Sequence, residues 1–291
     1  MLEIHPNKVS IKELHHYLLS SVAPRPIALA STIDLNGNKN ISPFSFFNVF
    51  SANPPIAIFS PARRVRNNTT KDTLCNIQAV REVVINVVNF NLVEQTSLSS
   101  VEYSSEIDEF IKAGLTPVKS KKIKPFRVEE SPIQMECKVT DIIELGKEGG
   151  AGNLIICKIV LIHINKNILN NEGQIDQNKL QLVGRMGSNW YSKGFDNALF
   201  EIEKPVKGIA IGFDQIPNWI KASPKFTRND LTKLASVNTI PEKNKIEEFI
   251  KNNKILNFKN QSAIEEKAKG YLNSNEIELA WQCLLAYKLK L

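Results

Sequence analysis

The chain has 291 residues, of which 42% are hydrophobic and 23% are charged, a composition typical of a globular protein rather than a disordered or fibrous one. It contains no run of about 18 apolar residues that would predict a membrane span, and its first residues lack the basic and apolar segments of a secretory signal. Cys75, Cys137, Cys157 and Cys283 show neither a paired nor a metal-ligand spacing. We therefore expect a soluble, cytoplasmic protein with reduced thiols and no bound metal.

The net charge of +7 is concentrated in the last third of the chain, where residues 205–291 hold 14 basic and 9 acidic side chains. Lysines such as Lys243 and Lys245 alternate with acidic and apolar residues, as they do on the solvated face of a helix. Few aromatic residues lie among them, whereas nucleic-acid surfaces combine basic and aromatic side chains. We therefore expect neither a nucleic-acid partner nor a membrane partner.

Before residue 205 the apolar runs are short and rich in β-branched residues, which predicts strands. The predicted strands are residues 26–33, 41–50, 56–59, 83–88, 135–141 and 154–164. Asn36-Gly37 predicts a hairpin between the first two, because both residues of such a turn favour positive φ. The last strand is almost entirely apolar, so we expect both of its faces to be covered. The absence of a regular βαβ pattern favours an antiparallel barrel or sandwich.

Two short helices are predicted within this β-rich part. Asp72 is a candidate cap for a helix over residues 73–80. Ser105 is a candidate cap for a helix over residues 106–113, and Gly114 would end it.

The periodicity becomes helical beyond residue 205. Ile246, Phe249 and Ile250 repeat at intervals of three and four, and residues 262–265 have the sequence of a capping box. A stripe in the final helix consists of Ile277, Trp281, Leu284 and Leu285. Such a stripe indicates core or dimer packing rather than a cofactor site. We predict a β-rich domain over residues 1–204 and a helical extension over residues 205–291 that packs on it.

Two further features carry little chemistry. The glycine cluster at residues 146–152 joins two predicted strands and precedes no helix, so we expect a mobile hairpin tip rather than a phosphate-binding loop. His15 and His16 are adjacent and cannot share a helix face as metal ligands, and His163 lies in an apolar strand as a core histidine would. Any chemistry would therefore belong to an organic cofactor.

Three clusters of polar residues, at residues 23–32, 40–48 and 63–73, lie in or beside predicted strands. Each alone has an ordinary explanation in turns and caps. Together they indicate a phosphate site. Lys71 supplies a cation, Thr73 supplies a hydroxyl and the helix N-terminus supplies N–H groups, and these are the groups that bind a phosphate. The serine, asparagine and phenylalanine side chains of residues 40–48 supply the polar edge and apolar faces that a flat heterocycle needs. This combination predicts a site for flavin mononucleotide (FMN).

The same residues resemble a known family. The motifs are Pro24-Arg25-Pro26 followed by Ser31-Thr32, Asn40-x-Ser42-Pro43-Phe44-Ser45-Phe46-Phe47-Asn48, Pro54-Pro55, Lys71-Asp72-Thr73-Leu74-x-Asn76-Ile77 and Gly184-Arg185-Met186-Gly187. In this order they are similar to the flavin-reductase-like family of FMN-binding split barrels. That family includes reductase components of two-component monooxygenases and flavoredoxin-like electron carriers. The resemblance covers about residues 18–235 and departs at Arg228, where longer members usually have glycine.

The resemblance implies a mainly β fold, a six-stranded antiparallel FMN-binding split barrel with crossing helices and a C-terminal helical extension. It also implies a homodimer with the flavin near the subunit interface. The implied activity is NAD(P)H:flavin reductase, in which NADH or NADPH gives hydride to flavin N5 and a second acceptor, a small molecule or a partner oxygenase, takes the electrons. The alternatives are a flavoredoxin-like FMN electron carrier without productive NAD(P)H oxidation, and an interaction protein that keeps the barrel without flavin.

We assign no catalytic side chain, because in this class the protein mainly orients the cofactor. The residues expected at the edge of the flavin ring are Ser31, Thr32 and Ser45, with Phe46 and Asn48 beside them. Those expected at the phosphate, or balancing its charge, are Arg25, Lys71 and Thr73. The remaining residues expected at the cofactor are Ser42, Ser60 and Asp72, together with Arg185 near the ring or the nicotinamide.

Overall fold

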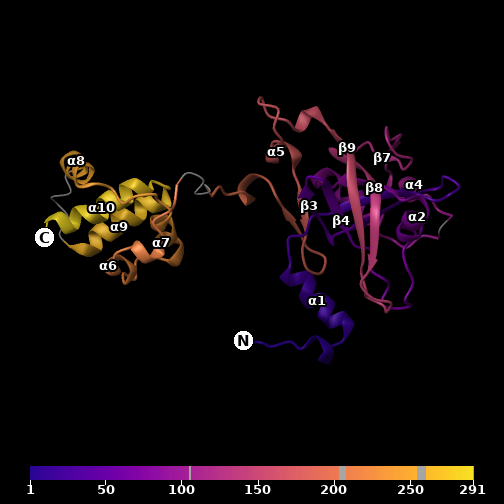
Figure 1. The fold of residues 1–291 in the computed structure, drawn as a ribbon, viewed down its shortest axis with the longest axis horizontal. Helices are drawn as coiled ribbons and strands as arrows, with labels where there is room; N and C mark the ends of the chain where they lie inside the picture. The colour runs from indigo at the N-terminus through magenta and orange to yellow at the C-terminus, as the bar shows by residue number, and fades with distance from the viewer. Residues whose placement is uncertain (105, 203–207, 254–259, 291) are drawn as a thin grey trace. The chain divides into compact units, whose positions relative to one another are not determined.

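The computed structural model describes residues 1–104, 106–202, 208–253 and 260–290 (Figure 1). The chain divides into two compact units, Met1–Phe200 and Glu201–Leu291. Each unit contains a hydrophobic core of its own. We predicted the division between residues 204 and 205, and both of these positions lie outside the described residues.

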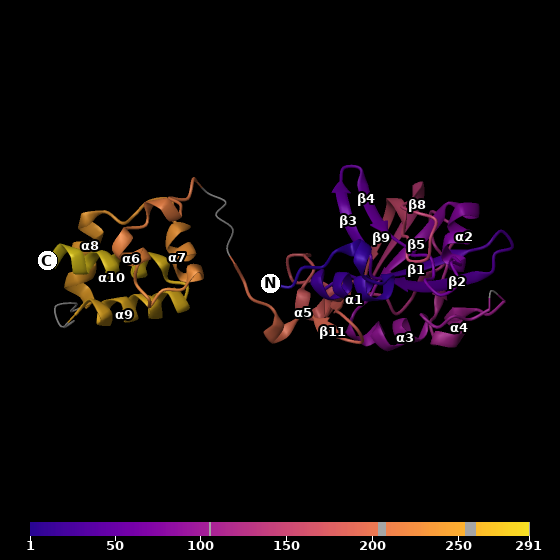
Figure 2. The same ribbon diagram turned by 90° about the horizontal axis from the view of Figure 1, so that it is seen from below.

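A seven-stranded antiparallel sheet forms the N-terminal unit, with the strand order β2-β1-β5-β8-β9-β4-β3 (Figure 1, Figure 2). Its strands are β1 (Ala28–Ile33), β2 (Lys39–Phe44), β3 (Phe47–Ala52), β4 (Pro55–Phe59), β5 (Glu82–Val87), β8 (Ile133–Glu144) and β9 (Asn153–Ile164). The two small sheets pair β6 (Pro117–Val118) with β7 (Arg127–Val128) and β10 (Val183–Arg185) with β11 (Tyr191–Lys193). This arrangement confirms the predicted mainly β, antiparallel class.

The sheet has seven strands instead of the predicted six because the segment predicted as one strand, residues 41–50, forms both β2 and β3. Only Ser45 and Phe46 separate the two strands, which lie at opposite ends of the strand order. The short connection therefore brings the two edges of the sheet together, as closing a barrel requires.

The predicted hairpin connects β1 and β2, and its turn depends on a residue outside the Asn-Gly pair. The Asp34 carboxylate accepts hydrogen bonds from the backbone N–H groups of Asn36 and Asn38, each at 2.8 Å. Gly37 has a positive φ of 87°, whereas Asn36 does not adopt a positive φ. The turn therefore differs from the predicted one, because the aspartate side chain replaces part of the backbone pairing.

The helices of this unit are α1 (Ile11–Ser21), α2 (Asp72–Val80), α3 (Val93–Leu98), α4 (Glu109–Ala113) and α5 (Gln177–Leu180). The N-cap of α2 is Lys71, so Asp72, the predicted cap, lies in the first turn instead. Asp108 caps α4 by accepting from the N–H of Phe110, and Gly114 ends the helix with a φ of 65°, as predicted. Ser105, the predicted cap, lies outside the described residues.

Strand β9 shows the clearest difference from prediction within the sheet. The first half of the strand packs into the core, where Ile155 and Cys157 are fully buried. In its second half Ile162 is 49% exposed and Ile164 is also exposed, so one face is uncovered in the single chain. The expectation that both faces of this strand are covered is therefore wrong for one copy of the chain.

The C-terminal unit is a helical bundle of α6 (Asn218–Lys221), α7 (Arg228–Ala235), α8 (Lys243–Asn253), α9 (Gln261–Asn273) and α10 (Ile277–Lys290). Trp281 is fully buried in its core, and the indole Nε1–H donates to the Leu234 carbonyl at 2.9 Å. Leu284 is also fully buried, and Ile277 and Leu285 pack against the same core. The predicted stripe is thus the internal core of this unit rather than a dimer surface.

Helix α9 begins earlier than the predicted capping box. Its cap is Asn260, whose side chain accepts from the N–H of Ala263. The Glu265 carboxylate instead accepts from the Ser223 hydroxyl at 2.8 Å, a contact between distant segments. None of the helices in the described ranges has both the length and the apolar composition needed to cross a membrane.

Candidate functional site

Four of the residues predicted at the cofactor line one narrow cavity in the N-terminal unit, at the start of α2. They are Ser42, Lys71, Asp72 and Thr73. The Lys71 ammonium donates to the Ser42 hydroxyl at 2.8 Å and lies 5.4 Å from the centre of the Phe44 ring. Two motifs that are about 30 residues apart in the chain therefore meet here, because β2 passes beside the start of α2. We call this space the Lys71 cavity.

The N-terminus of α2 faces this cavity without a side-chain cap. Lys71 occupies the N-cap position in an extended conformation, and its side chain makes no capping hydrogen bond with the N–H groups of the first turn. The first N–H groups of a helix have no intrahelical partner and carry a partial positive charge. Together with the Lys71 ammonium they form a local environment that favours an anion.

A buried polar network supports the cavity from behind. The hydroxyls of Thr73 and Thr32 both donate to the Asn40 side-chain oxygen, at 2.9 and 3.2 Å. The Asn76 amide donates to the Thr32 hydroxyl at 3.1 Å. The Asn40 amide in turn donates to one oxygen of Glu109 at 2.8 Å. Because these groups bond to one another, the network holds β1, β2, α2 and α4 in register around the cavity.

Two effects in the Lys71 cavity disfavour the charged form of the lysine. Burial lowers the pKa of Lys71, and the charge of Arg64 lowers it further, whereas Glu109 and Asp72 act in the opposite direction. An incoming anion would offset both of the effects that disfavour the ammonium. The cavity is therefore better suited to a negatively charged group than to a neutral one.

Arg64, which is not among the residues predicted at the cofactor, lines the same cavity. Its guanidinium donates to the Thr70 carbonyl at 2.6 Å and pairs with Glu102 at 3.0 Å. The glycine cluster predicted as a free hairpin tip packs against this loop, because the Gly150 N–H donates to the Arg63 carbonyl at 2.9 Å. A Cβ atom on Gly149 would approach the Arg64 carbonyl to 3.0 Å. The glycines thus permit a close backbone contact that holds Arg64 in place.

A second group of predicted residues gathers around Arg25. Its side chain is buried and donates to the Ser45 hydroxyl at 3.3 Å, to the Met186 carbonyl at 3.1 Å and to two carbonyls at the end of α1. Its backbone pairs with that of Arg185. Burial, followed by the charge of Arg185, lowers the pKa of Arg25. The donors of this guanidinium are therefore already bonded within the protein. Arg25 lies beside Ser45 and Arg185 rather than in the Lys71 cavity.

Arg185 extends this second group outward. Its guanidinium lies 4.6 Å from the centre of the Tyr191 ring and donates to the Trp190 carbonyl at 3.0 Å. Phe46 is 41% exposed and makes an edge contact with His15. Arg185 and Tyr191 thus form a partly exposed, cationic and aromatic pair.

The remaining predicted residues are divided among different positions. Ser60 is buried, and its N–H donates to the Phe46 carbonyl at 2.9 Å. Asn48 is exposed on β3, where its side chain accepts from the next N–H. Ser31 is fully buried and donates to the Phe126 carbonyl, so it lies apart from Thr32. Adjacent residues of a strand point to opposite faces, which explains this separation.

Glu109 and Asn76 also belong to the cavity region and were missed as candidate residues. An acidic residue in the first turn of a short helix is usually a solvated, dipole-compensating residue, so its sequence position gave no indication of burial. His163, predicted as a core histidine, contacts the buried Glu136 carboxylate at 2.7 Å. That carboxylate also accepts from the N–H groups of Lys121 and Lys122.

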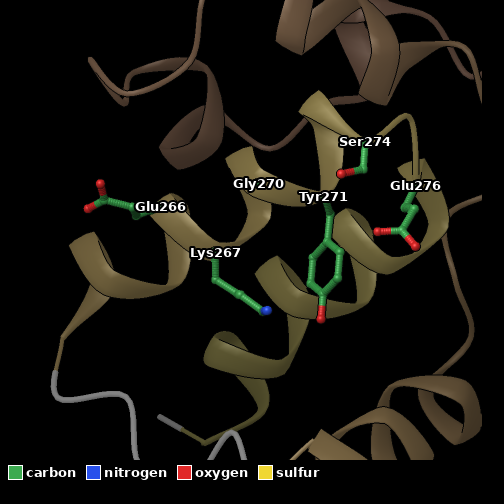
Figure 3. A pocket seen from close by; sticks show the side chains of 6 residues that line it. All are labelled: Glu266, Lys267, Gly270, Tyr271, Ser274 and Glu276. Carbon is green, nitrogen blue, oxygen red and sulfur yellow. The ribbon is translucent and has the colours of Figure 1, made fainter.

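An open hollow on the C-terminal unit contains none of the predicted residues (Figure 3). It lies on α9 and the turn that leads to α10, and its lining residues are Glu266, Lys267, Gly270, Tyr271, Ser274 and Glu276. The Lys267 ammonium lies 4.8 Å from the centre of the Tyr271 ring, and acidic groups flank the pair. Its charges are mixed, and none of these six lining residues is buried.

Comparisons with known proteins find relatives that cover about 70% of this chain. An uncharacterized protein of Halalkalibacterium halodurans is 35% identical over 206 residues, which cover 70% of this chain and 97% of that protein. The crystal structure of nitrilotriacetate monooxygenase component B from Bacillus cereus is 29% identical, with a TM-score of 0.64 over 69% of this chain and 98% of the other. A Shewanella frigidimarina structure, described as a flavin reductase with a split barrel domain, is 25% identical. Its TM-score is 0.58 over 70% of this chain and 100% of the other.

The structural neighbours show that the sheet of the N-terminal unit is a split barrel, as predicted. The family model described as "Flavin reductase like domain" matches residues 19–181, which include the Lys71 cavity and most of the residues around Arg25. The match extends over more than half of the chain. The protein therefore belongs to the flavin-reductase-like domain family.

Proposed function

We propose that this protein is an FMN-binding oxidoreductase of the NAD(P)H:flavin reductase type. The observation that supports this most directly is the Lys71 cavity, where a half-buried ammonium, a hydroxyl and an uncapped helix N-terminus converge. A phosphate monoester needs these donors. The named functions of the structural neighbours, a monooxygenase component B and a flavin reductase, support the same class.

We propose a narrower set of residues that would hold the cofactor. At the phosphate we propose Lys71, Ser42 and the N–H of Thr73, because the Thr73 hydroxyl is already bonded to Asn40. Ser42 and Ser45 lie on one continuous segment that leads from the Lys71 cavity toward Arg25. The ring would lie toward Ser45 and Phe46, with Arg185 at its exposed side. Ser31 and Thr32 are bonded within the protein and would act only through their neighbours.

When bound, FMN supplies the redox chemistry: acceptance of hydride from NADH or NADPH at flavin N5 and onward transfer of electrons to a second acceptor. The chain's own residues bind the phosphate, orient the ring and leave one face open. A small molecule or a partner oxygenase would serve as the acceptor. No side chain is assigned as an acid or base.

The experiment that tests this function is anaerobic mixing of the FMN-loaded protein with NADH and, separately, with NADPH. We expect rapid loss of the flavin absorbance with at least one nucleotide. If dithionite bleaches the flavin and neither nucleotide does, the protein is an electron carrier of the flavoredoxin type. If the folded protein retains no flavin when FMN is supplied, the interaction-protein alternative holds.

We also propose a homodimer, for which the uncovered face of β9 is the supporting observation. Ile162 on β9 and Phe50 on β3 are 49% and 65% exposed, and exposed apolar groups on a sheet indicate a partner surface. Sedimentation should give twice the monomer mass, and Ile162→Lys should shift the protein toward monomer. Leu35→Lys, at an exposed hairpin residue, is the matched control and should stay dimeric. A monomeric wild-type protein at all concentrations would contradict the proposal.

A further inference from the structure

Glu109 is an unusual residue in the wall of the Lys71 cavity. It is only 7% exposed, although it lies in the first turn of α4. One carboxyl oxygen, Oε1, accepts from the Asn40 amide at 2.8 Å. The other, Oε2, is buried and has no hydrogen-bond partner within the described part of the chain. A buried polar atom without a partner is costly, and such atoms often mark a place where a ligand completes the bonding.

The position of Glu109 creates a conflict with a bound phosphate. Glu109 lines the same cavity as Lys71 and Thr73. A phosphate monoester carries between one and two negative charges near neutral pH, since its second pKa is about 6. An ionised carboxylate in the same small cavity would repel that charge and compete for the Lys71 ammonium. A neutral carboxyl would instead donate one hydrogen bond, which is the bond that Oε2 lacks.

We propose that Glu109 binds the phosphate as a neutral carboxyl, so that FMN binding takes up one proton from solvent. The proton lies between Glu109 Oε2 and a phosphate oxygen, and it is released when FMN dissociates. This inference rests on the proposed function, because it needs the phosphate at the Lys71 cavity. Burial raises the pKa of Glu109, and Asp72 adds to this, while nearby N–H groups and Asn40 oppose it.

Other titratable and charged groups around the cavity must be separated from Glu109 in any test. They are Lys71 and Arg64 on the loop before α2, Asp72 on α2, Glu102 and Tyr103 before α4, Lys39 on β2 and Asp108 beside Glu109. Glu102 is paired with Arg64 and Arg66, and Lys39 is paired with Asp108 at 2.7 Å. Lys71 is the main competing titration, because loss of its proton would also weaken phosphate binding at high pH.

The test is the dissociation constant of FMN from about pH 7 to about pH 9, measured by flavin fluorescence in wild type and Glu109→Gln. If binding takes up one full proton, wild-type affinity falls by about tenfold for each unit by which the pH rises. The glutamine keeps the acceptor for Asn40 and carries a permanent donor at the second position. We therefore expect Glu109→Gln to bind FMN with a much flatter pH profile and to bind more tightly than wild type at the high end. Riboflavin, which lacks the phosphate, should show no such dependence in either protein.

Asp108→Asn is the matched control. It removes one charge from the neighbouring residue and keeps a good N-cap, and Asp108 is not among the residues that line the cavity. This variant should retain the wild-type pH profile. Calorimetry of wild type in HEPES and in Tris, whose ionisation enthalpies differ, gives an independent count of the protons taken up.

The outcomes distinguish this inference from the proposed function. Equal pH profiles in wild type and Glu109→Gln, or a proton count of zero near pH 8, would overturn the role of Glu109 while FMN binding stands. If wild type binds no FMN at any pH, both the role of Glu109 and the proposed function are overturned. A flat profile confined to Glu109→Gln, with about one proton counted in wild type, would establish the proton-coupled site.

Discussion

Replacing Trp281 with alanine is expected to lower the free energy of unfolding of the helical unit by about 3–5 kcal/mol, the usual cost of truncating a large buried aromatic side chain. The indole is fully buried, and its N–H is bonded to the Leu234 carbonyl. The variant therefore leaves both a cavity and a buried carbonyl without its donor. Hydrogen exchange of the amides of α7 and α10 should report the loss directly.

Trp190→Ala is the control for this experiment, because Trp190 is 76% exposed. Its effect on the stability of either unit should lie within about 0.5 kcal/mol. Because the units are separately compact, the sheet should keep its own stability in Trp281→Ala. An undiminished stability of the helical unit in Trp281→Ala would mean that its core does not depend on this residue.

Lys71→Ala is expected to weaken FMN binding by about tenfold to a hundredfold, since a hydrogen bond to a charged group contributes about 1.5–3 kcal/mol. The fold should survive, because Lys71 is only half-buried and its position at the N-cap does not depend on its side chain. Removal of the ammonium also leaves the Ser42 hydroxyl without the donor that holds it. Equilibrium titration with FMN, followed by quenching of flavin fluorescence, measures the change.

Two comparisons make the Lys71 result specific. Riboflavin affinity should change little in Lys71→Ala, because the phosphate is the group that the ammonium binds. Lys39→Ala removes the same charge from β2, where Lys39 is paired with Asp108, and should weaken FMN binding much less. Unchanged FMN affinity in Lys71→Ala would show that the phosphate binds elsewhere.

The strands could be predicted from the sequence because their signals are local. Alternation of polar and apolar residues located β8, and short β-branched runs located β1, β5 and β9. The same local patterns placed the start of α2 next to Lys71 and the end of α4 at Gly114. Caps were less predictable, because several neighbouring polar residues can fill the same role. Asp108 could thus cap α4, and Asn260 could cap α9 ahead of the predicted Ser262.

The separation of Ser31 from Thr32 follows from strand geometry. Ser31 and Thr32 are adjacent in a strand, so their side chains must point to opposite faces and cannot both line one side of a site. The structure has Ser31 bonded to Phe126 and Thr32 bonded to Asn40. Alternation alone would have separated the two residues.

The sequence by itself determined the order of the motifs, the change from strand to helix periodicity near residue 205 and the presence of a lysine at a helix start. Only the tertiary structure decided that Arg25 bonds to Ser45 and Met186 and that Trp281 is an internal core residue. It also decided that Glu109 is buried and that one of its oxygens has no hydrogen-bond partner among the described residues. The physical reason is the separation along the chain of the residues that interact. Strand and helix periodicity depends on neighbouring residues, whereas burial and the partner of a charged group depend on segments that are distant in the chain and meet only when the sheet closes.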